Sequence, residues 1–161
     1  MFKVKFITAD SSDFDIVKSI RTAVFTNEQG ADAKTEFDRF DEVGTPSVFA
    51  VLYENETPAA TARLVLGDKG YKIGRIAVLK EFRGKGYGDV IVRTMLLKAF
   101  DSGAKEVFVD AQNYAVPFYE KIGFRVIGEE ITDRGLPHIP MMVTPDKIKS
   151  KCSCSQERSN G

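Results

Sequence analysis

Three glycines and two cations lie within six residues of one another, in the segment RGKGYG from Arg83 to Gly88. An apolar run at 73–79 precedes this segment, and a helix-like run at 89–100 follows it. The first turn of a helix presents unpaired backbone N–H groups at the positive end of the helix dipole, and glycines let the backbone come close to a ligand. Because Arg83 and Lys85 add positive charge, the segment predicts a binding site for a phosphate group.

The spacing of these glycines disfavours two common nucleotide sites. The Walker sequence Gly-x-x-x-x-Gly-Lys-Ser/Thr is absent from the chain. A dinucleotide fingerprint would need a third glycine at position 89, where the chain has Asp89, and its glycines would follow the first strand of the fold. Here four strands are predicted before the glycines, so the phosphate is assigned to neither kind of nucleotide.

Acid–base and metal chemistry can draw on few side chains. His138 is the only histidine, so a two-histidine zinc motif cannot be built, and a histidine-dependent mechanism must use this residue. The two cysteines, Cys152 and Cys154, form one C-x-C pair in the polar tail KSKCSCSQERSNG, which supplies too few ligands for a structural zinc site. No metal site is predicted.

Three arginines are candidates for binding an anionic substrate group. Arg21 falls within the apolar stripe of a predicted helix, where it either extends past the edge of the core or points into a cavity. Arg75 lies on an inward strand face by alternation, and Arg63 lies on the neighbouring strand. The alternative for Arg63 and Arg75 is pairing with carboxylates inside the protein. The acids considered for that pairing are Asp38, Asp41 and Asp110.

An α+β fold is expected to position these residues. Apolar alternation predicts strands at 3–8, 47–53, 59–65, 71–78, 105–112, 124–127 and 137–143, and helical spacing predicts helices at 14–28, 89–102 and 116–122. The segment 132–135 is expected to be a turn, and two prolines in the last strand predict an edge or irregular strand. The strand order suggests a mostly antiparallel sheet interrupted by helices.

The whole chain has 161 residues with 23 acidic and 23 basic side chains, which predicts one domain without a preference for nucleic acid or anionic membranes. No apolar run approaches the roughly 20 residues of a spanning helix. The first residues lack a signal-peptide pattern, so a cytoplasmic location is expected. The domain is predicted to cover 1–144, and the polar segment 145–161 is predicted to be disordered.

The glycine segment and its surroundings resemble the GNAT superfamily of N-acetyltransferases. Arg83–Gly88 fits the pyrophosphate motif Arg/Gln-x-x-Gly-x-Gly/Ala, GRIAVLKEF stands where that superfamily has its fourth strand, and VFVDAQNYAVPFYEKIGFRVIG looks like its fifth strand and following helix. The resemblance spans roughly 2–143. Four further stretches, IRTAVFTNEQ, FDRFDE, TARLV and GLPHIPM, resemble a branch of small bacterial acetyltransferases with a Pro-His-Ile-x-Met ending.

This resemblance implies a GNAT fold with a sheet of about seven strands, in which the fourth and fifth strands splay apart and the pantetheine arm of acetyl-CoA inserts between them. It implies direct transfer of an acetyl group from acetyl-CoA to a primary amine in a ternary complex. The residues that would contact acetyl-CoA are Ile76, Ala77, Val78, Arg83, Gly84, Lys85, Gly86, Tyr87, Gly88, Asn113, Val116, Phe118 and Tyr119.

Two catalytic roles follow from the same resemblance. Tyr119 stands at the position that protonates the leaving thiolate, and the alternative is a tyrosine that only packs in the core. His138 is the candidate base for the amine, because an imidazole can accept a proton near neutral pH. A structural histidine is the alternative. Glu28 is the second candidate base, and it joins Arg21, Arg63 and Arg75 in the predicted substrate-binding set.

The acceptor is predicted to be a small amine that carries an anionic group. Acetyltransferases of glyphosate-like amines have arginines at positions matching Arg21 and Arg75, and a third, near Gln112 or Asn113 here, is missing, so glyphosate itself is not expected. The alternatives are a protein or peptide acetyltransferase, which the acidic segment 30–42 would suit, and a CoA-binding sensor without turnover. A homodimer is compatible with the sequence, since dimers are frequent in the superfamily.

Overall fold

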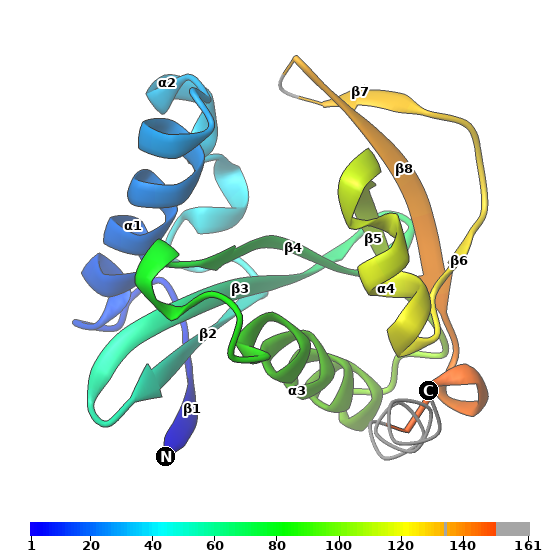
Figure 1. Cartoon of the computed structure of the whole chain (residues 1–161), viewed down its shortest axis with the longest axis horizontal. Coiled ribbons are helices and arrows are strands. Elements are labelled where there is room, and N and C mark those ends of the chain that lie inside the picture. The colour runs from blue at the N-terminus through cyan, green and yellow to red at the C-terminus, as the bar shows by residue number, and fades with distance from the viewer. Residues whose placement is uncertain (134, 151–161) are drawn as a thin grey trace.

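A mixed sheet of eight strands forms the centre of the protein (Figure 1). The computed structural model describes residues 1–133 and 135–150. The strands are β1 Phe2–Ile7, β2 Ser47–Glu54, β3 Thr57–Gly67, β4 Gly70–Val78, β5 Val107–Gln112, β6 Arg125–Val126, β7 Ile131–Asp133 and β8 Leu136–Val143. They lie in the order β1-β2-β3-β4-β5-β8-β6, and β7 pairs with β8. The strands β4 and β5 pair in parallel, and the other neighbours pair antiparallel.

Helices cover both faces of this sheet. The helical segments are α1 Phe14–Arg21, η1 Thr22–Glu28, α2 Ala33–Glu36, η2 Arg39–Asp41, η3 Lys80–Phe82, α3 Tyr87–Asp101, η4 Asn113–Ala115, α4 Val116–Ile122 and η5 Pro145–Lys147. Successive residues of β2 point to opposite faces: Phe49 and Val51 pack in one core with α1, while Ala50 and Leu52 pack in the other core with α3. The α+β prediction is therefore confirmed, with eight strands where about seven were expected.

The strands β4 and β5 part soon after they meet. Their parallel pairing is limited to Tyr71 with Val107 and Lys72 with Phe108, although β4 continues to Val78 and β5 to Gln112. A change of register between β3 and β4 accompanies the parting, and Arg75 has a left-handed backbone there with φ 50°. The predicted splay of these two strands is confirmed, and it leaves the β5-facing edge of β4 without a ladder.

Three elements differ from their predictions. The predicted helix at 14–28 changes from an α-helix to the π-helix η1 at Thr22, a distinction that apolar spacing cannot make. The predicted turn at 132–135 overlaps β7, which adds the extra strand. The last strand, β8, was predicted to be an edge or irregular strand, and the edge alternative is wrong because β8 lies between β5 and the short strands β6 and β7.

A gap between β6 and β7 explains how β8 accommodates Pro140. The carbonyl of Pro140 accepts a hydrogen bond from Ile127 N–H on the β6 side, so the nitrogen of Pro140 faces the same side. On that side β6 pairs with Met141 and Met142, and β7 pairs with the residues up to His138. At Pro140 neither β6 nor β7 forms a ladder with β8, although Ile127 stands opposite, so the missing N–H of Pro140 interrupts no ladder.

The folded part of the chain extends past the predicted boundary at residue 144. Residues Pro145–Lys147 form the turn η5, and the N–H of Lys149 donates to the carbonyl of Ile122 over 2.8 Å. Arg93 donates to the carbonyl of Lys149. The rest of the predicted tail, with Cys152 and Cys154, lies outside the described residues. Within residues 1–133 and 135–150, no helix has the length and apolar character needed to cross a membrane.

Candidate active site

The glycine segment turns directly into the first turn of α3. Gly84 and Gly86 have left-handed backbones with φ 84° and 83°, and α3 begins at Tyr87. No side chain of the described residues caps this start, so its N–H groups and the positive end of the helix dipole are available to an anion. The arrangement fits the pyrophosphate group that the sequence predicts.

Each cation of this segment is held by a carboxylate from another element. Arg83 forms two hydrogen bonds of 2.8 Å with Glu28, and Lys85 lies 2.7 Å from Glu54. Tyr87 also donates to Glu54 over 2.7 Å. The hydrogen bond from Arg83 lowers the pKa of Glu28, and the hydrogen bonds from Lys85 and Tyr87 lower the pKa of Glu54.

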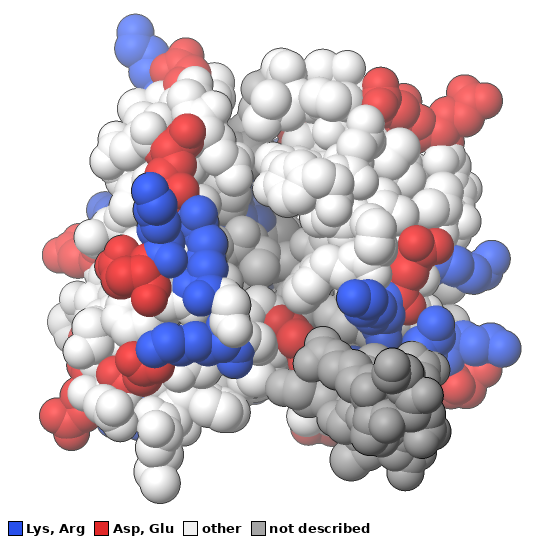
Figure 2. Space-filling view, viewed as in Figure 1, with Lys and Arg blue, Asp and Glu red and all other residues white. Residues whose placement is uncertain are grey.

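A cavity of about 850 Å³ lies along the parted strands. Figure 2 shows the molecule hollowed between the half that carries α1 and α2 and the half that carries α4 and β8. Residues of β4, β5, α4 and β8 line it, among them Ile76, Gln112, Tyr119 and His138. The two predicted catalytic residues, which are 19 positions apart in sequence, therefore share one cavity.

The position of Tyr119 is compatible with both of its predicted interpretations. It is buried in α4, with its ring edge-on to Phe118 at 5.0 Å and to Phe124 at 5.5 Å between ring centres. Within the described part of the chain its hydroxyl has no hydrogen-bond partner, and the residue lines the cavity. Burial, with a smaller effect from Tyr114, raises the pKa of Tyr119 well above its ordinary value. The phenol is therefore a proton donor at neutral pH.

His138 is buried in β8, and its ring contacts the backbone of the same strand. Its Nδ1 lies 3.0 Å from the carbonyl oxygen of Leu136. A carbonyl only accepts hydrogen bonds, so Nδ1 carries the hydrogen. In the neutral ring Nε2 then has a lone pair, which is the form that a base requires.

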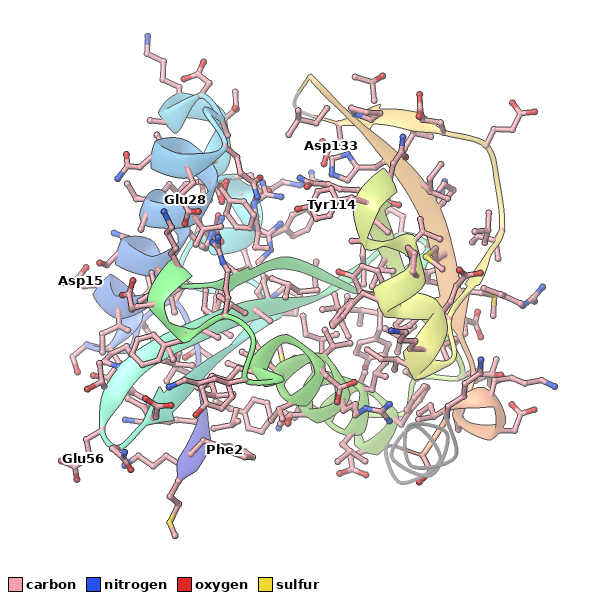
Figure 3. All side chains as sticks on the ribbon, viewed as in Figure 1. Phe2, Asp15, Glu28, Glu56, Tyr114 and Asp133 are labelled. Carbon is pink, nitrogen blue, oxygen red and sulfur yellow. The ribbon has the colours of Figure 1, made fainter. Side chains whose placement is uncertain are left out.

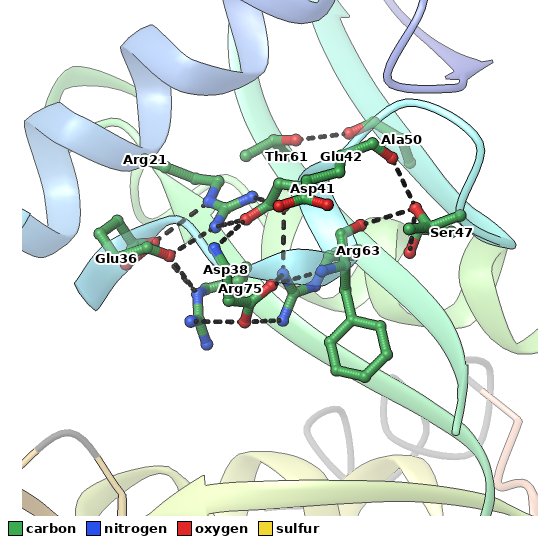
Figure 4. Close-up of polar contacts among 12 residues, drawn as sticks. Arg21, Glu36, Asp38, Asp41, Glu42, Ser47, Ala50, Thr61, Arg63 and Arg75 are labelled. Carbon is green, nitrogen blue, oxygen red and sulfur yellow. Dashed lines mark hydrogen bonds and ion pairs between the residues drawn. The ribbon is translucent and has the colours of Figure 1, made fainter. Parts of the chain in front are cut away.

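Arg21 lies inside the protein instead of in the cavity (Figure 4). Its side chain is fully buried, with Nη1 2.6 Å from Asp41, Nε 3.1 Å from Glu36, and Nη2 2.8 Å from the carbonyl of Glu36. Its guanidinium also lies over the ring of Phe37, 4.6 Å from the ring centre. The prediction that Arg21 contacts substrate is therefore wrong, because its guanidinium N–H groups are directed to Glu36 and Asp41.

Arg63 and Arg75 line the cavity but follow the predicted alternative, since both form ion pairs within the protein. Arg63 lies 2.7 Å from Asp38 and 3.1 Å from Asp41. Arg75 lies 3.2 Å from Glu36 and 3.3 Å from Asp38. Asp110, the third acid considered, pairs with Lys72 instead. The arginine network is the set of Arg21, Glu36, Asp38, Asp41, Arg63 and Arg75, with three positive and three negative side chains.

Asp41 is held as an anion within this network. Burial alone would raise the pKa of Asp41, but hydrogen bonds from Arg21 and the charge of Arg21 oppose it. The backbone N–H of Asp38 and the charge of Arg63 act in the same direction, so the pKa of Asp41 lies below its ordinary value of 3.8. The network therefore fastens the 33–41 segment to α1 and β3 through ionised groups.

Comparison with known proteins agrees with this geometry. Residues 21–145 match the model of the acetyltransferase (GNAT) domain. The chain belongs to the GNAT family of acetyltransferases. It is 40% identical over 124 residues to the uncharacterized N-acetyltransferase YjcF of Bacillus subtilis (strain 168), covering 76% of this chain and 86% of YjcF. Acetyl transfer is therefore the reaction class of this GNAT protein.

Solved structures have the same GNAT fold. The crystal structure of Escherichia coli ElaA superposes with a TM-score of 0.78 at 25% identity, over 89% of this chain and 99% of ElaA. A GNAT family acetyltransferase from Elizabethkingia anophelis, solved with acetyl-CoA bound, superposes with a TM-score of 0.65 at 20% identity, over 89% of this chain and 97% of that one.

Glu28 was predicted to contact the substrate or act as the base, but it lies outside the cavity. Arg83 occupies both of its carboxylate oxygens. Its lowered pKa also makes it a weak base. The prediction that Glu28 contacts substrate or acts as the base is therefore not supported by the geometry, and His138 is the better candidate.

The remaining predicted acetyl-CoA contacts surround the gap between β4 and β5. Ile76, Ala77 and Val78 end β4 beyond its pairing with β5, so their backbone edge faces the gap. Gly88 lies beside Phe118, where an added Cβ would be in ordinary contact with that ring at 3.6 Å. Asn113 and Val116 stand at the starts of η4 and α4, and the amide of Asn113 donates to Glu130 over 3.1 Å. Their contacts with acetyl-CoA stay predictions.

Phe25, Gln29 and Tyr114 are among the cavity-lining residues that sequence reasoning missed. Gln29 accepts a hydrogen bond from Gln112 over 3.4 Å, which joins the end of η1 to the end of β5. Figure 3 shows Tyr114 projecting from the α4 side toward the space between the two halves. Its place directly after Asn113 in the predicted CoA-binding stretch was the available signal.

Proposed function

We propose that this GNAT protein transfers the acetyl group of acetyl-CoA to the primary amine of a small acceptor, by direct attack in a ternary complex. The observation that carries the proposal is that Tyr119, a protonated phenol, and His138, an imidazole with a proton-accepting Nε2, line one cavity beside the gap between β4 and β5. A proton donor and a proton acceptor are the two groups that this transfer needs.

The donor side of the chain fits acetyl-CoA, which would supply an activated thioester. The uncapped start of α3 and the left-handed glycines Gly84 and Gly86 suit a pyrophosphate. The open edge at Ile76–Val78 suits the amide groups of the pantetheine arm, as an added strand would. Among the described residues no group of three or more His, Cys, Asp or Glu could hold a metal ion.

The two catalytic side chains would act at opposite ends of the transfer. Nε2 of His138 accepts a proton from the acceptor amine, whose nitrogen forms the new bond to the acetyl carbon. The phenol of Tyr119 donates its proton to the sulfur as the carbon–sulfur bond breaks. The cavity contributes by holding the reacting groups in line, which removes much of the entropic cost of the encounter.

The cavity wall favours a small acceptor over a peptide. The acids that would have attracted a lysine side chain, Glu36, Asp38 and Asp41, are engaged with arginines. Arg63 and Arg75 line the cavity while paired with Asp38, whose side chain is 34% exposed and is the outermost carboxylate of the arginine network. We propose an amine that also carries one carboxylate-like group, which would share these two arginines with Asp38.

An amine screen tests this function. The protein is incubated with acetyl-CoA and a library of amino acids, amino sugars, simple amines and lysine peptides, and thiol release is measured. Release with small anionic amines supports the proposal, whereas release with lysine peptides alone favours the peptide alternative. Calorimetry with CoA is run in parallel. Binding of CoA without thiol release in the whole library would favour the sensor alternative.

A further inference from the structure

We infer that Glu28 and Arg83 form a clamp that joins the CoA-binding loop to the wall of the acceptor cavity, with Glu28 as a positioning residue for CoA. The inference rests on the proposed function. It assigns Glu28 a role in the binding of CoA. In this inference the side chain of Arg83 mainly connects two parts of the protein and is not the main ligand of the pyrophosphate.

The geometry of the clamp is two-sided. Both terminal nitrogens of Arg83 donate to Glu28 over 2.8 Å, and its Nε donates to the carbonyl of Val78 over 2.9 Å. The two side chains are 43% and 33% exposed, and ion pairs at such exposure generally contribute little. A forked pair with a third anchor is the favourable exception, because the guanidinium is fixed from η1 and from β4 at once.

These contacts occupy most of the hydrogen-bond donors of Arg83 in the protein without CoA. Three of the five N–H groups of a guanidinium are directed to Glu28 and Val78. The pyrophosphate is then left mainly to the backbone N–H groups between Gly84 and Gly88 and to the α3 dipole. The clamp sets where those N–H groups stand, since Arg83 is the residue directly before them.

The other end of the clamp reaches the acceptor wall. Glu28 is the last residue of the π-helix η1, which also carries Phe25, and Gln29 follows it. Phe25 and Gln29 line the cavity, and Gln29 bonds to Gln112 at the end of β5. The donor loop, η1 and β5 are therefore connected through consecutive contacts, so that ordering of the loop by CoA also orders the wall that the acceptor meets.

Calorimetry with CoA on variants of the full chain tests the clamp. Glu28→Gln, Arg83→Gln and the double variant are compared with wild type, and Glu81→Gln serves as the control because Glu81 is an exposed carboxylate two residues before Arg83. Each single variant is expected to weaken CoA binding by about fivefold, the lower end of typical coupling between sites. The double variant should bind no more weakly than either single one, since both remove the same contact. Glu81→Gln should bind as wild type does.

Direct contact of Arg83 with the pyrophosphate makes the opposite prediction for Glu28. Removing a carboxylate beside the phosphates would then leave CoA binding unchanged or tighter, while Arg83→Gln alone would weaken it, and this result would overturn the clamp. If wild-type protein binds CoA and Glu28→Gln binds it equally well, the proposed function stands and only this inference is overturned. Wild-type protein that does not bind CoA overturns both.

Hydrogen exchange separates the clamp from a general loss of structure. In wild type, CoA is expected to slow exchange of the backbone amides at 22–31, and this protection should disappear in Glu28→Gln and Arg83→Gln. The variants should keep the wild-type exchange pattern without CoA. Absence of CoA-induced protection at 22–31 in wild type would overturn the link to the acceptor wall.

Discussion

The Nδ1 atom of His138 lies 3.0 Å from the carbonyl oxygen of Leu136, two residues earlier in β8. This contact fixes the hydrogen on Nδ1 and leaves the lone pair of the neutral ring on Nε2. His138 also lines the same cavity as Tyr119.

Replacement of His138 by Gln should remove the base while keeping a polar side chain of similar length. The expected result is a fall in kcat/KM of about a hundredfold, the lower range for general acid–base catalysis. Steady-state kinetics measure the change, and a variant with the wild-type kcat/KM would show that another group is the base.

Tyr119→Phe tests the proton donor without disturbing the packing. The hydroxyl makes no hydrogen bond within the described residues and the ring contacts with Phe118 and Phe124 remain, so the melting temperature should hardly change. The turnover number should fall by about a hundredfold because the leaving thiolate loses its acid. Steady-state kinetics and a thermal melt check both parts, and unchanged turnover would restrict Tyr119 to a packing role.

Arg21→Met should be strongly destabilising, because it leaves Glu36 and Asp41 buried without their partner. Breaking one member of a buried ionic group costs about 3–5 kcal/mol of the free energy of unfolding. Lys5→Met is the matched control, since Lys5 pairs with Asp13 at the surface with 55% of its side chain exposed, and it should leave the urea midpoint unchanged. Equal effects of the two substitutions would contradict the buried network.

The lowered pKa of Asp41 predicts a specific loss of stability in acid. A carboxyl whose pKa is lower when folded than when unfolded stabilises the fold above its unfolded pKa, here 3.8, and loses that contribution as pH falls through the folded value. The free energy of unfolding, measured with urea between about pH 6 and about pH 3, should therefore decline on the acidic side. In Asp41→Asn the decline should be shallower, and an identical slope would exclude Asp41 as a contributor.

Gly123→Ala should destabilise the protein through a clash with the backbone at 147–148. A Cβ at Gly123 would lie 2.3 Å from the carbonyl oxygen of Lys147, and the backbone has φ 128°. Gly44→Ala is the control, because Gly44 also has a left-handed φ, 92°, with nothing within 4 Å of its Cβ position. Gly44→Ala should cost about 1 kcal/mol for the backbone alone, and Gly123→Ala should cost clearly more. Equal melting temperatures would argue against the packing of 145–150.

The donor side was predictable because its chemistry is local in the sequence. The segment from Arg83 to Gly88 carries its own glycines and is followed at once by α3, so neighbouring residues determine the anion site. The strands that build the sheet were also recognisable from their alternation. The short strand β7 was missed because three residues give too little alternation to distinguish a strand from a turn.

The acceptor side was not predictable from helical spacing alone. Helical spacing predicted that Arg21 points into the protein, and its side chain is buried. Spacing cannot show whether a buried cation faces a cavity or a carboxylate. Arg21's partners Glu36 and Asp41 lie 15 and 20 residues away, in the acidic segment 30–42, for which no helix or strand was predicted. Glu28 was misassigned for the same reason, since its partner Arg83 is 55 residues distant.

The arginine network also restricts how the sequence can change over evolutionary time. Each of the three carboxylates pairs with two of the arginines, so a neutralising substitution at one position leaves an unbalanced charge against a buried neighbour. A tolerated path therefore passes through compensating changes at two or more of the six positions. Among relatives, these positions should vary as sets, and a lineage that lost Arg21 should also have replaced Glu36 or Asp41 with an uncharged residue.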